Sequence, residues 1–172
     1  VLACGAEQPR ELDIPGSCLN GVHYAMEFLC AQNRKEAGDR GKNRLSSEGK
    51  RVVVIGGGDT GSDCVGTANR QRAAHVLQID RNSRLPDRVD KSLVWPDWPK
   101  QFGTSSSQEE GGERDFRVMP KRIEGKRGKV DKIIACRVDC HGGKYVEEPG
   151  SEYEIPADMV IVAMGFAGPA AS

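Results

Sequence analysis

Apolar residues in the middle of the chain follow the pattern of a strand, a helix and a second strand. Residues 51–55, Arg-Val-Val-Val-Ile, carry an unbroken β-branched run, which is typical of a strand buried on both faces of a parallel sheet. A glycine-rich turn follows directly, and the sequence then predicts a helix over about 59–71 and a second strand over 75–80. These elements together predict a βαβ unit.

The first third of the chain predicts one further helix. Apolar residues recur at helical spacing between Val22 and Ala37, with Asn20 as the candidate cap and Gly38 as the candidate stop. Residues 38–49 are rich in Lys, Arg, Gly and Ser, and they predict an exposed loop.

The last third predicts mainly strands. Runs near 116–123, 130–139 and 153–155 are separated by glycine-containing turns, which favours an antiparallel meander. Residues 157–165 predict a second doubly buried strand, whereas 81–112 lack periodicity and predict a long surface segment. The fold class is therefore α/β: a Rossmann-like domain with a parallel sheet, a βαβ unit and an antiparallel β-meander.

Composition narrows the class of protein. The 172 residues are 37% hydrophobic, enough for one domain with a core, and 25 Lys and Arg balance 25 Asp and Glu. This balance argues against a nucleic-acid partner, and the longest apolar run, residues 159–164, is too short to span a membrane. No signal peptide is recognisable, so we expect a cytoplasmic protein. The opening residues look like the end of a buried strand, which predicts a piece of a longer chain.

Cysteine and histidine positions give no metal site and no catalytic pair. The six cysteines lack a C-x-x-C motif, and the three histidines are widely scattered. We expect free thiols rather than disulfides, and Cys64 as a small packing residue rather than a nucleophile. Since no nucleophile–base pair emerges either, the residues predict no catalytic group, and any chemistry would belong to a bound cofactor.

The turn after the first central strand carries the sharpest chemical signal. Gly56, Gly58 and Gly61 form a G-x-G-x-x-G fingerprint between a strand and a helix, the arrangement that binds a dinucleotide. Gly56 would allow the tight turn, Gly58 would let the backbone approach a pyrophosphate, and Gly61 would let helix and strand pack closely. Asp59 and Thr60 are candidate caps of the helix, and Thr60 is also expected near phosphate. The fingerprint predicts NAD(P) binding.

The end of the second strand bears on the choice of coenzyme. Asp80 lies 19 residues past Gly61, close to the spacing of the acid that binds the adenosine ribose in NAD-dependent domains. Arg81 and Arg84 follow, and a guanidinium there would suit the 2′-phosphate of NADPH. Both coenzymes, NADH and NADPH, remain open on these residues.

The segment 95–112 begins with an unusual pair of tryptophans. Trp95, Pro96, Trp98 and Pro99 fit either a hydrophobic staple within the segment or part of a partner surface. Composition favours the staple.

Five stretches together resemble the small (β) subunit of glutamate synthase, or the equivalent region of its fused form. They span nearly the whole chain, and the tryptophan–proline loop and the Gly-Asp-Thr-Gly-x-Asp-Cys helix are the most specific. The stretches are residues 14–16, 21–29, 56–68, 95–99 and 163–169.

This resemblance implies an NAD(P)H-binding domain inserted into an FAD-binding domain. Residues 1–15 would be the crossover segment from the FAD domain, 16–165 the NAD(P)H domain, and 166–172 the return segment. Gly165 would lie where the returning strand meets both cofactors. In the parent enzyme NAD(P)H would reduce FAD, and electrons would pass through iron–sulfur clusters to FMN on the large subunit. There, 2-oxoglutarate and glutamine-derived ammonia would yield glutamate.

Some features depart from that family pattern. Only one glycine fingerprint is present, no cysteine set for iron–sulfur clusters occurs, and Cys4 stands where related flavoproteins usually carry Thr. We therefore expect this chain alone to bind NAD(P)H without turning over.

Two alternatives stay open beside this assignment. The first is the dinucleotide domain of another FAD and iron–sulfur oxidoreductase, such as a dihydropyrimidine dehydrogenase-like enzyme; the missing C-x-x-C argues against a thioredoxin reductase-like one. The second is a subunit-docking module that uses residues 95–112.

Overall fold

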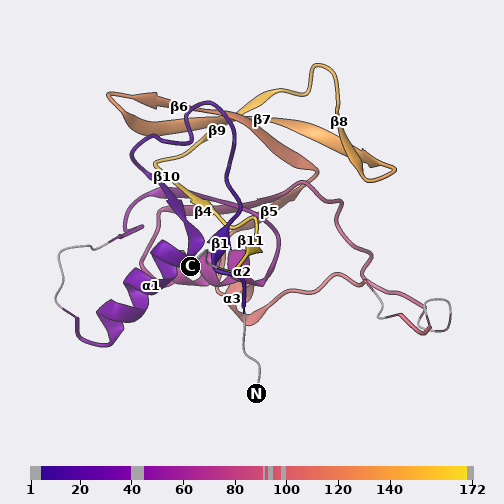
Figure 1. Cartoon of the computed structure of the whole chain (residues 1–172), viewed down its shortest axis with the longest axis horizontal. Helices are drawn as coiled ribbons and strands as arrows, with labels where there is room; N and C mark the ends of the chain where they lie inside the picture. The colour runs from indigo at the N-terminus through magenta and orange to yellow at the C-terminus, as the bar shows by residue number, and fades with distance from the viewer. Residues whose placement is uncertain (1–4, 40–44, 91, 93–94, 98–99, 170–172) are drawn as a thin grey trace.

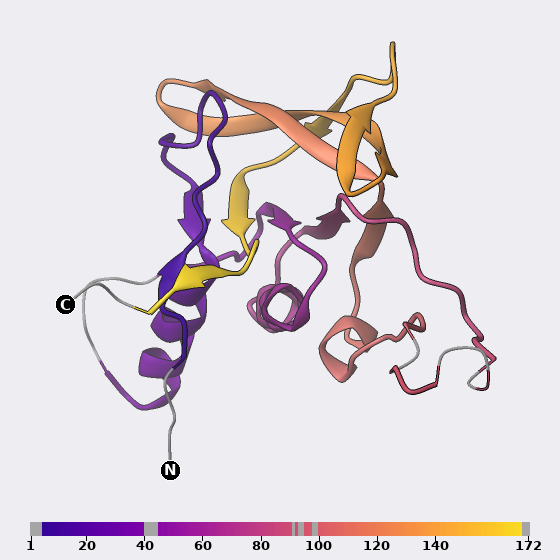
Figure 2. The ribbon, with the colours of Figure 1, turned by 45° about the vertical axis from the view of Figure 1, so that its right-hand side comes forward.

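The elements of the chain lie in three layers, shown edge-on in Figure 2. The computed structural model describes residues 5–39, 45–90, 92, 95–97 and 100–169. Helices form one outer layer, a parallel sheet the middle one, and an antiparallel sheet the other outer layer (Figures 1 and 2). The predicted α/β class, with its parallel sheet and antiparallel strands, is confirmed.

The middle layer is a five-stranded parallel sheet in the order β2-β10-β3-β4-β5. Its strands are β2 (Val22–Tyr24), β3 (Arg51–Ile55), β4 (His75–Asp80), β5 (Glu113–Phe116) and β10 (Met159–Val162). The three central strands, β10, β3 and β4, correspond to the strands predicted over 157–165, 51–55 and 75–80. Since their side chains alternate between the two faces, Val52 and Val54 pack toward the helices, whereas Val53 and Ile55 pack toward the antiparallel sheet.

The helical layer consists of α1 (Ala25–Glu36), α2 (Asp59–Arg70) and the single turn α3 (Ser106–Glu109). Gly38 has a positive φ of 83° and donates its N–H to the Lys35 carbonyl, so the predicted end of the first helix is confirmed. Its predicted start is wrong. Tyr24, not Asn20, is the N-cap, because residues 22–24 pair with β10 as an edge strand before the helix begins.

The antiparallel layer is built around one long strand. β7 (Lys129–His141) pairs with β6 (Val118–Lys126) on one side. On its other side it pairs with β9 (Tyr153–Pro156) and then β8 (Lys144–Glu147). The predicted antiparallel arrangement is thus confirmed, although β8 was not predicted.

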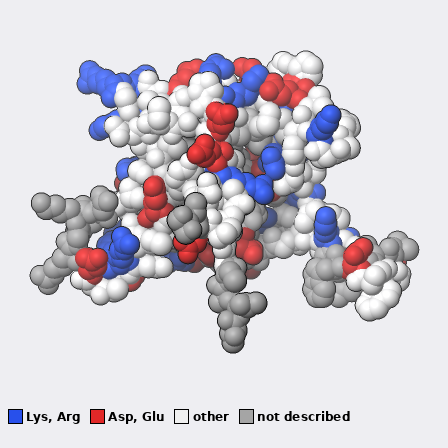
Figure 3. All heavy atoms as spheres, in the orientation of Figure 1, with Lys and Arg blue, Asp and Glu red and all other residues white. Residues whose placement is uncertain are grey.

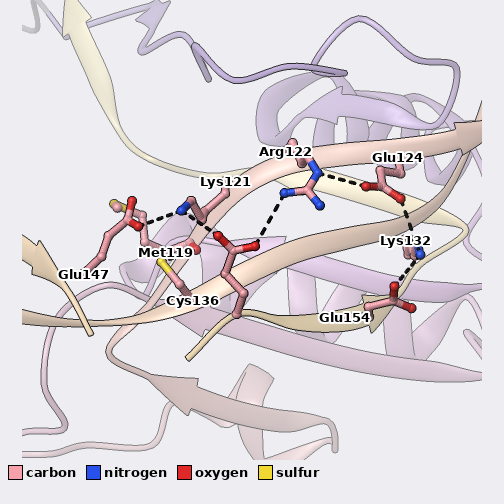
Figure 4. A network of polar contacts seen from close by, with 9 residues as sticks. Met119, Lys121, Arg122, Glu124, Lys132, Cys136, Glu147 and Glu154 are labelled. Atoms are coloured by element: carbon pink, nitrogen blue, oxygen red, sulfur yellow. Dashed lines mark hydrogen bonds and ion pairs between the residues drawn. The ribbon is translucent and has the colours of Figure 1, made fainter. Parts of the chain in front are cut away.

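Ion pairs cover the outer face of this antiparallel sheet (Figure 4). Lys121 contacts carboxylates of Glu147 and Glu152 at 2.7 Å each, which raises the pKa of the lysine mainly through its hydrogen bond with Glu147. Beneath them Cys136 is almost fully buried. Basic and acidic side chains are also interspersed over the face of the molecule in Figure 3.

A separate two-stranded ribbon joins the early and late parts of the chain. β1 (Gln8–Pro9) pairs antiparallel with β11 (Phe166–Gly168), and Gln8 lies opposite Gly168. The strand-like opening predicted for residues 1–5 lies outside the described residues except for Gly5, which is in no strand.

The long segment 81–112 departs from its prediction in two ways. It contains α3, capped by Ser105, which accepts a hydrogen bond from the Gln108 N–H. The side chain of Trp95 is 84% exposed, so the staple predicted for it is wrong; Trp98 and Pro99 lie outside the described residues. Among the described helices, none is long and apolar enough to cross a bilayer.

Candidate functional site

A groove of about 720 Å³ opens where β3, β4 and β10 end. In a parallel α/β sheet this carboxyl edge is the usual place for a ligand, because the turns into the helices meet there. The groove is lined by residues of the glycine-rich turn, the end of β4, the start of β6 and the segment around β1. They are residues 10–14, 55–60, 79–82, 118–120 and 163–165.

Gly56 makes the turn out of β3 and leaves no space for a side chain. Its φ is +128°, and a Cβ at this position would lie 2.1 Å from the carbonyl oxygen of Ala163. The turn is further fixed by the Gly56 N–H, which donates to the Ile79 carbonyl at 2.9 Å. The predicted role of Gly56 in a tight turn is therefore confirmed.

Gly58 stands at the mouth of α2 with open space around it. A Cβ here would have no heavy atom within 4 Å, and the residue is exposed at the groove. Gly58 is the N-cap, and no side chain caps the helix. The first backbone N–H groups of α2, which have no intrahelical acceptor, therefore point toward the groove and attract an anion.

Asp59 and Thr60 line the groove, but they do not cap the helix. They are its first two residues, so the capping role predicted for their side chains is wrong. Among the described lining residues, Arg10 and Arg81 stand against four carboxylates, and neither arginine belongs to the glycine turn, so pyrophosphate binding at that turn would depend on backbone N–H groups. Cys64, one turn further along, is fully buried; burial raises its pKa to about 12, which confirms packing rather than nucleophilic chemistry.

Gly61 lies under the turn, where a Cβ would stand 2.4 Å from the Gly56 carbonyl oxygen. The predicted close packing of helix and strand is confirmed.

Sequence reasoning missed the neighbouring Gln78, which is 2% exposed and donates through Nε2 to the Gly56 carbonyl at 2.8 Å. Gln108 of α3 in turn donates to Gln78 Oε1 at 2.8 Å. A relay of two amides thus fixes the turn from below.

Asp80 ends β4 and lies against the glycine turn. A Cβ on Gly57 would be 1.9 Å from Asp80 Oδ2, so the carboxylate and the turn are in close contact. The other oxygen, Oδ1, accepts hydrogen bonds from both the backbone N–H and the side-chain amide of Asn82, each at 2.9 Å. Asn82 also lines the groove and was not predicted.

The two predicted arginines are separated by the structure. Arg81 lines the groove, and its guanidinium carbon lies 4.6 Å from the centre of the Tyr145 ring. Arg84 does not line the groove: it pairs with Asp87 at 2.6 Å and stacks on Phe102 at 4.0 Å.

Gly165 also lines the groove, and it has a positive φ of 83°. Its carbonyl accepts the backbone N–H of Arg10 at 3.0 Å, and the Arg10 side chain donates to the Phe166 carbonyl. Gly165 also borders a smaller cavity of about 260 Å³ formed with residues of β1, α1 and β11. Arg10 was not predicted, because no local motif marks a residue whose partners, Gly165 and Phe166, lie so far along the chain.

The structure brings most predicted site residues together. Those that line one groove are Gly56, Gly58, Asp59, Thr60, Asp80, Arg81 and Gly165. Gly61 packs against the turn without lining the groove, and Arg84 does not line the groove either.

Comparison with known proteins gives both relatives and structural neighbours. The chain is 47% identical over 98% of its length to the glutamate synthase [NADPH] small chain of Mycobacterium tuberculosis, and it spans 36% of that protein. It is 37% identical over 98% of its length to the glutamate synthase [NADH] of Schizosaccharomyces pombe, of which it spans 9%. The chain therefore covers about a third of the small chain that it matches.

The fold has solved counterparts as well. The structure of Mycobacterium tuberculosis FprA in complex with NADPH has a TM-score of 0.62 with 17% identity, over 95% of this chain and 49% of that one. A family model described as pyridine nucleotide-disulphide oxidoreductase matches residues 1–171. The chain belongs to this family of oxidoreductases.

Proposed function

We propose that the chain is the pyridine-nucleotide-binding domain of a glutamate synthase small subunit, and that it binds NADPH or NADH in the groove above the glycine turn. One observation carries the proposal: the uncapped N-terminus of α2 opens beside Gly58, where no side chain obstructs a pyrophosphate. The bound coenzyme would supply a hydride for FAD in the whole enzyme. The residues of this chain bind and orient it.

The named relatives support the parent reaction. Glutamate synthase small chains match almost all of this sequence, so we infer that the whole protein forms glutamate from glutamine and 2-oxoglutarate with a large subunit as partner. FAD and iron–sulfur clusters would belong to that whole protein. The described cysteines are all free, which supports a cytoplasmic location.

The proposed division of the chain follows from the same comparison. Residues 16–165 would form the nucleotide domain, with 1–15 and 166–172 as connections to an FAD-binding domain. The pairing of β1 with β11 supports this proposal, because it places the two connections side by side.

The first test is a parallel titration of NADH and NADPH into the chain, followed by calorimetry and amide chemical shifts. We expect saturable binding with shifts centred on residues 56–61. Gly58→Ala should weaken binding by at least about tenfold and lower the unfolding midpoint only slightly, because its methyl group meets the pyrophosphate and no protein atom, while alanine is a somewhat poorer N-cap than glycine.

Two further glycine variants serve as controls. Gly103→Ala adds a methyl group in equally open surroundings away from the groove and should change neither binding nor stability. Gly56→Ala should cost about 3 kcal/mol or more of folding free energy through its clash with Ala163. Unchanged coenzyme affinity in Gly58→Ala would overturn the site, and glutamate synthesis from NADPH by this chain alone would overturn its assignment as a binding domain.

The exposed Trp95 supports a second function, docking of a partner subunit through residues 95–112. A pull-down with the large subunit that fails for Trp95→Ala but persists for Gly58→Ala would support it. The two functions are compatible, because Trp95 does not line the groove.

A further inference from the structure

Three arginines gather around the Asp80 end of the groove, each stacked on an aromatic ring. Arg81 lies over Tyr145 at 4.6 Å, Arg84 over Phe102 at 4.0 Å, and Arg114 over both Phe102 and Phe116, at 4.4 and 5.5 Å. Burial and then the charge of Arg84 lower the pKa of Arg114, while the charge of Asp80 raises it. Such a cluster favours an anionic ligand.

Only one of the three guanidinium groups both lines the groove and lacks a carboxylate partner. Arg84 is paired with Asp87, and Arg114 donates to the Gly103 carbonyl and does not line the groove. For Arg81 no ion pair is formed within the described residues. The Arg81 guanidinium is instead stacked on the Tyr145 ring.

Tyr145 comes from β8, in the other sheet, and it fixes two successive residues after β4. Its ring supports Arg81, and its hydroxyl donates to Asn82 Oδ1 at 2.6 Å. The Asn82 amide then donates to Asp80 Oδ1, which also accepts the Asn82 backbone N–H. One aromatic side chain therefore holds the guanidinium at the groove, while one oxygen of the Asp80 carboxylate, Oδ1, accepts hydrogen bonds from Asn82.

We propose that Tyr145 is a positioning residue that makes the site prefer NADPH over NADH. It presents Arg81 to the 2′-phosphate, the anionic group that distinguishes the two coenzymes and that reaches the end of the second strand of a dinucleotide fold. This inference rests on the proposed function, because it requires a dinucleotide in the groove.

The test measures dissociation constants of both NADPH and NADH for the full chain and five variants. The wild type should bind NADPH more tightly. Arg81→Gln should weaken NADPH binding by about tenfold or more and leave NADH unchanged, because a charge-assisted contact is lost. Tyr145→Leu should weaken NADPH binding by about two- to fivefold, again without changing NADH, since the guanidinium stays but is no longer held.

Two variants and a double mutant separate positioning from a structural effect. Tyr145→Phe keeps the ring and should retain most of the NADPH preference. Val146→Ala, the exposed neighbour on the same strand, should behave as wild type. Arg81→Gln combined with Tyr145→Leu should bind NADPH no more weakly than Arg81→Gln alone, because Tyr145 acts only through the arginine.

The possible failures are distinguishable. If the wild type binds neither coenzyme, both the proposed function and this inference are overturned. If both bind and NADH binds more tightly, or if Tyr145→Leu leaves the ratio of the two constants unchanged, only the inference is overturned. An equal loss of affinity for both coenzymes in Tyr145→Leu also overturns it, because that is the result of a structural role.

Discussion

The three glycines of the turn have different roles, because a side chain added at each position would meet different neighbours. Gly56 faces backbone, Gly61 faces the turn itself, and Gly58 faces open space. Residue type and spacing predicted all three surroundings, since the fingerprint is a local pattern. Asn82 and Tyr145 could not be predicted in the same way, because they are 63 residues apart and acquire their roles only when the two sheets pack.

The ion pair between Arg51 and Asp158 predicts how the stability of the fold depends on pH. Asp158 joins the starts of β3 and β10: its carboxylate accepts the backbone N–H and the guanidinium of Arg51 at 2.7–2.9 Å. The side-chain hydrogen bond from Arg51 is the main reason why the pKa of Asp158 falls to about 2. Since the folded pKa is depressed, the stabilisation is present above about pH 4, the unfolded pKa, and is lost as the pH falls toward 2.

Asp158→Asn should therefore lower the free energy of unfolding by about 1 kcal/mol near neutral pH, a modest value because both side chains are about 40% exposed. Urea denaturation between pH 6 and pH 2.5 measures this difference, which should shrink below pH 4. A difference that stays constant over that range would contradict the assignment.

At the scale of elements, the short and polar ones were the hardest to predict. β2 has three residues and runs directly into α1, so its apolar side chains merged with the helical pattern. β5, Glu-Arg-Asp-Phe, lies at the edge of the parallel sheet, where polar residues are tolerated, and its sequence carries little strand signal. The long buried strands β3 and β10 were predicted because burial on both faces demands continuous apolar sequence.

The two hydrogen bonds of the Gln78 side chain link α3, β4 and the glycine turn. They predict that Gln78→Leu lowers both the stability of the fold and the affinity for coenzyme. Leucine would leave the Gly56 carbonyl and the Gln108 amide without their partner, so unfolding should become easier by about 1–3 kcal/mol. Coenzyme affinity should fall as well, since the turn loses its support. Chemical denaturation and titration measure the two effects. Gln101→Leu is the control, because it removes an exposed hydrogen bond, from the Gln101 amide to the Asp87 carbonyl, and should cost much less.

At the scale of the whole molecule, the described residues form two apolar clusters on the two faces of one sheet. Ile133 belongs to the cluster under the antiparallel sheet and Phe28 to the cluster under the helices, and both are fully buried. Because β3 and β10 contribute alternate residues to each cluster, the clusters cannot separate without breaking those strands. The sequence predicted the elements but not this stacking, which depends on contacts between distant segments.

This shared sheet predicts a single cooperative transition. Ile133→Ala should cost about 2–4 kcal/mol and Phe28→Ala about 3–5 kcal/mol, and each should lower the unfolding midpoint of the whole chain. Amide signals from β7 and α1, followed by NMR through a urea titration, should disappear together in both variants. Separate midpoints for the two layers would show that the clusters fold independently.

The ribbon of β1 and β11 has a consequence for protein engineering. Gln8 and Gly168 face each other across a strand pair, so the intervening residues form a unit whose two ends leave it side by side. A unit of this geometry can replace the turn of a hairpin in an unrelated host without separating the host's strands. Such a graft would carry the groove at the ends of β3, β4 and β10 into the host, and binding of the proposed coenzyme there would be coupled to the stability of the host.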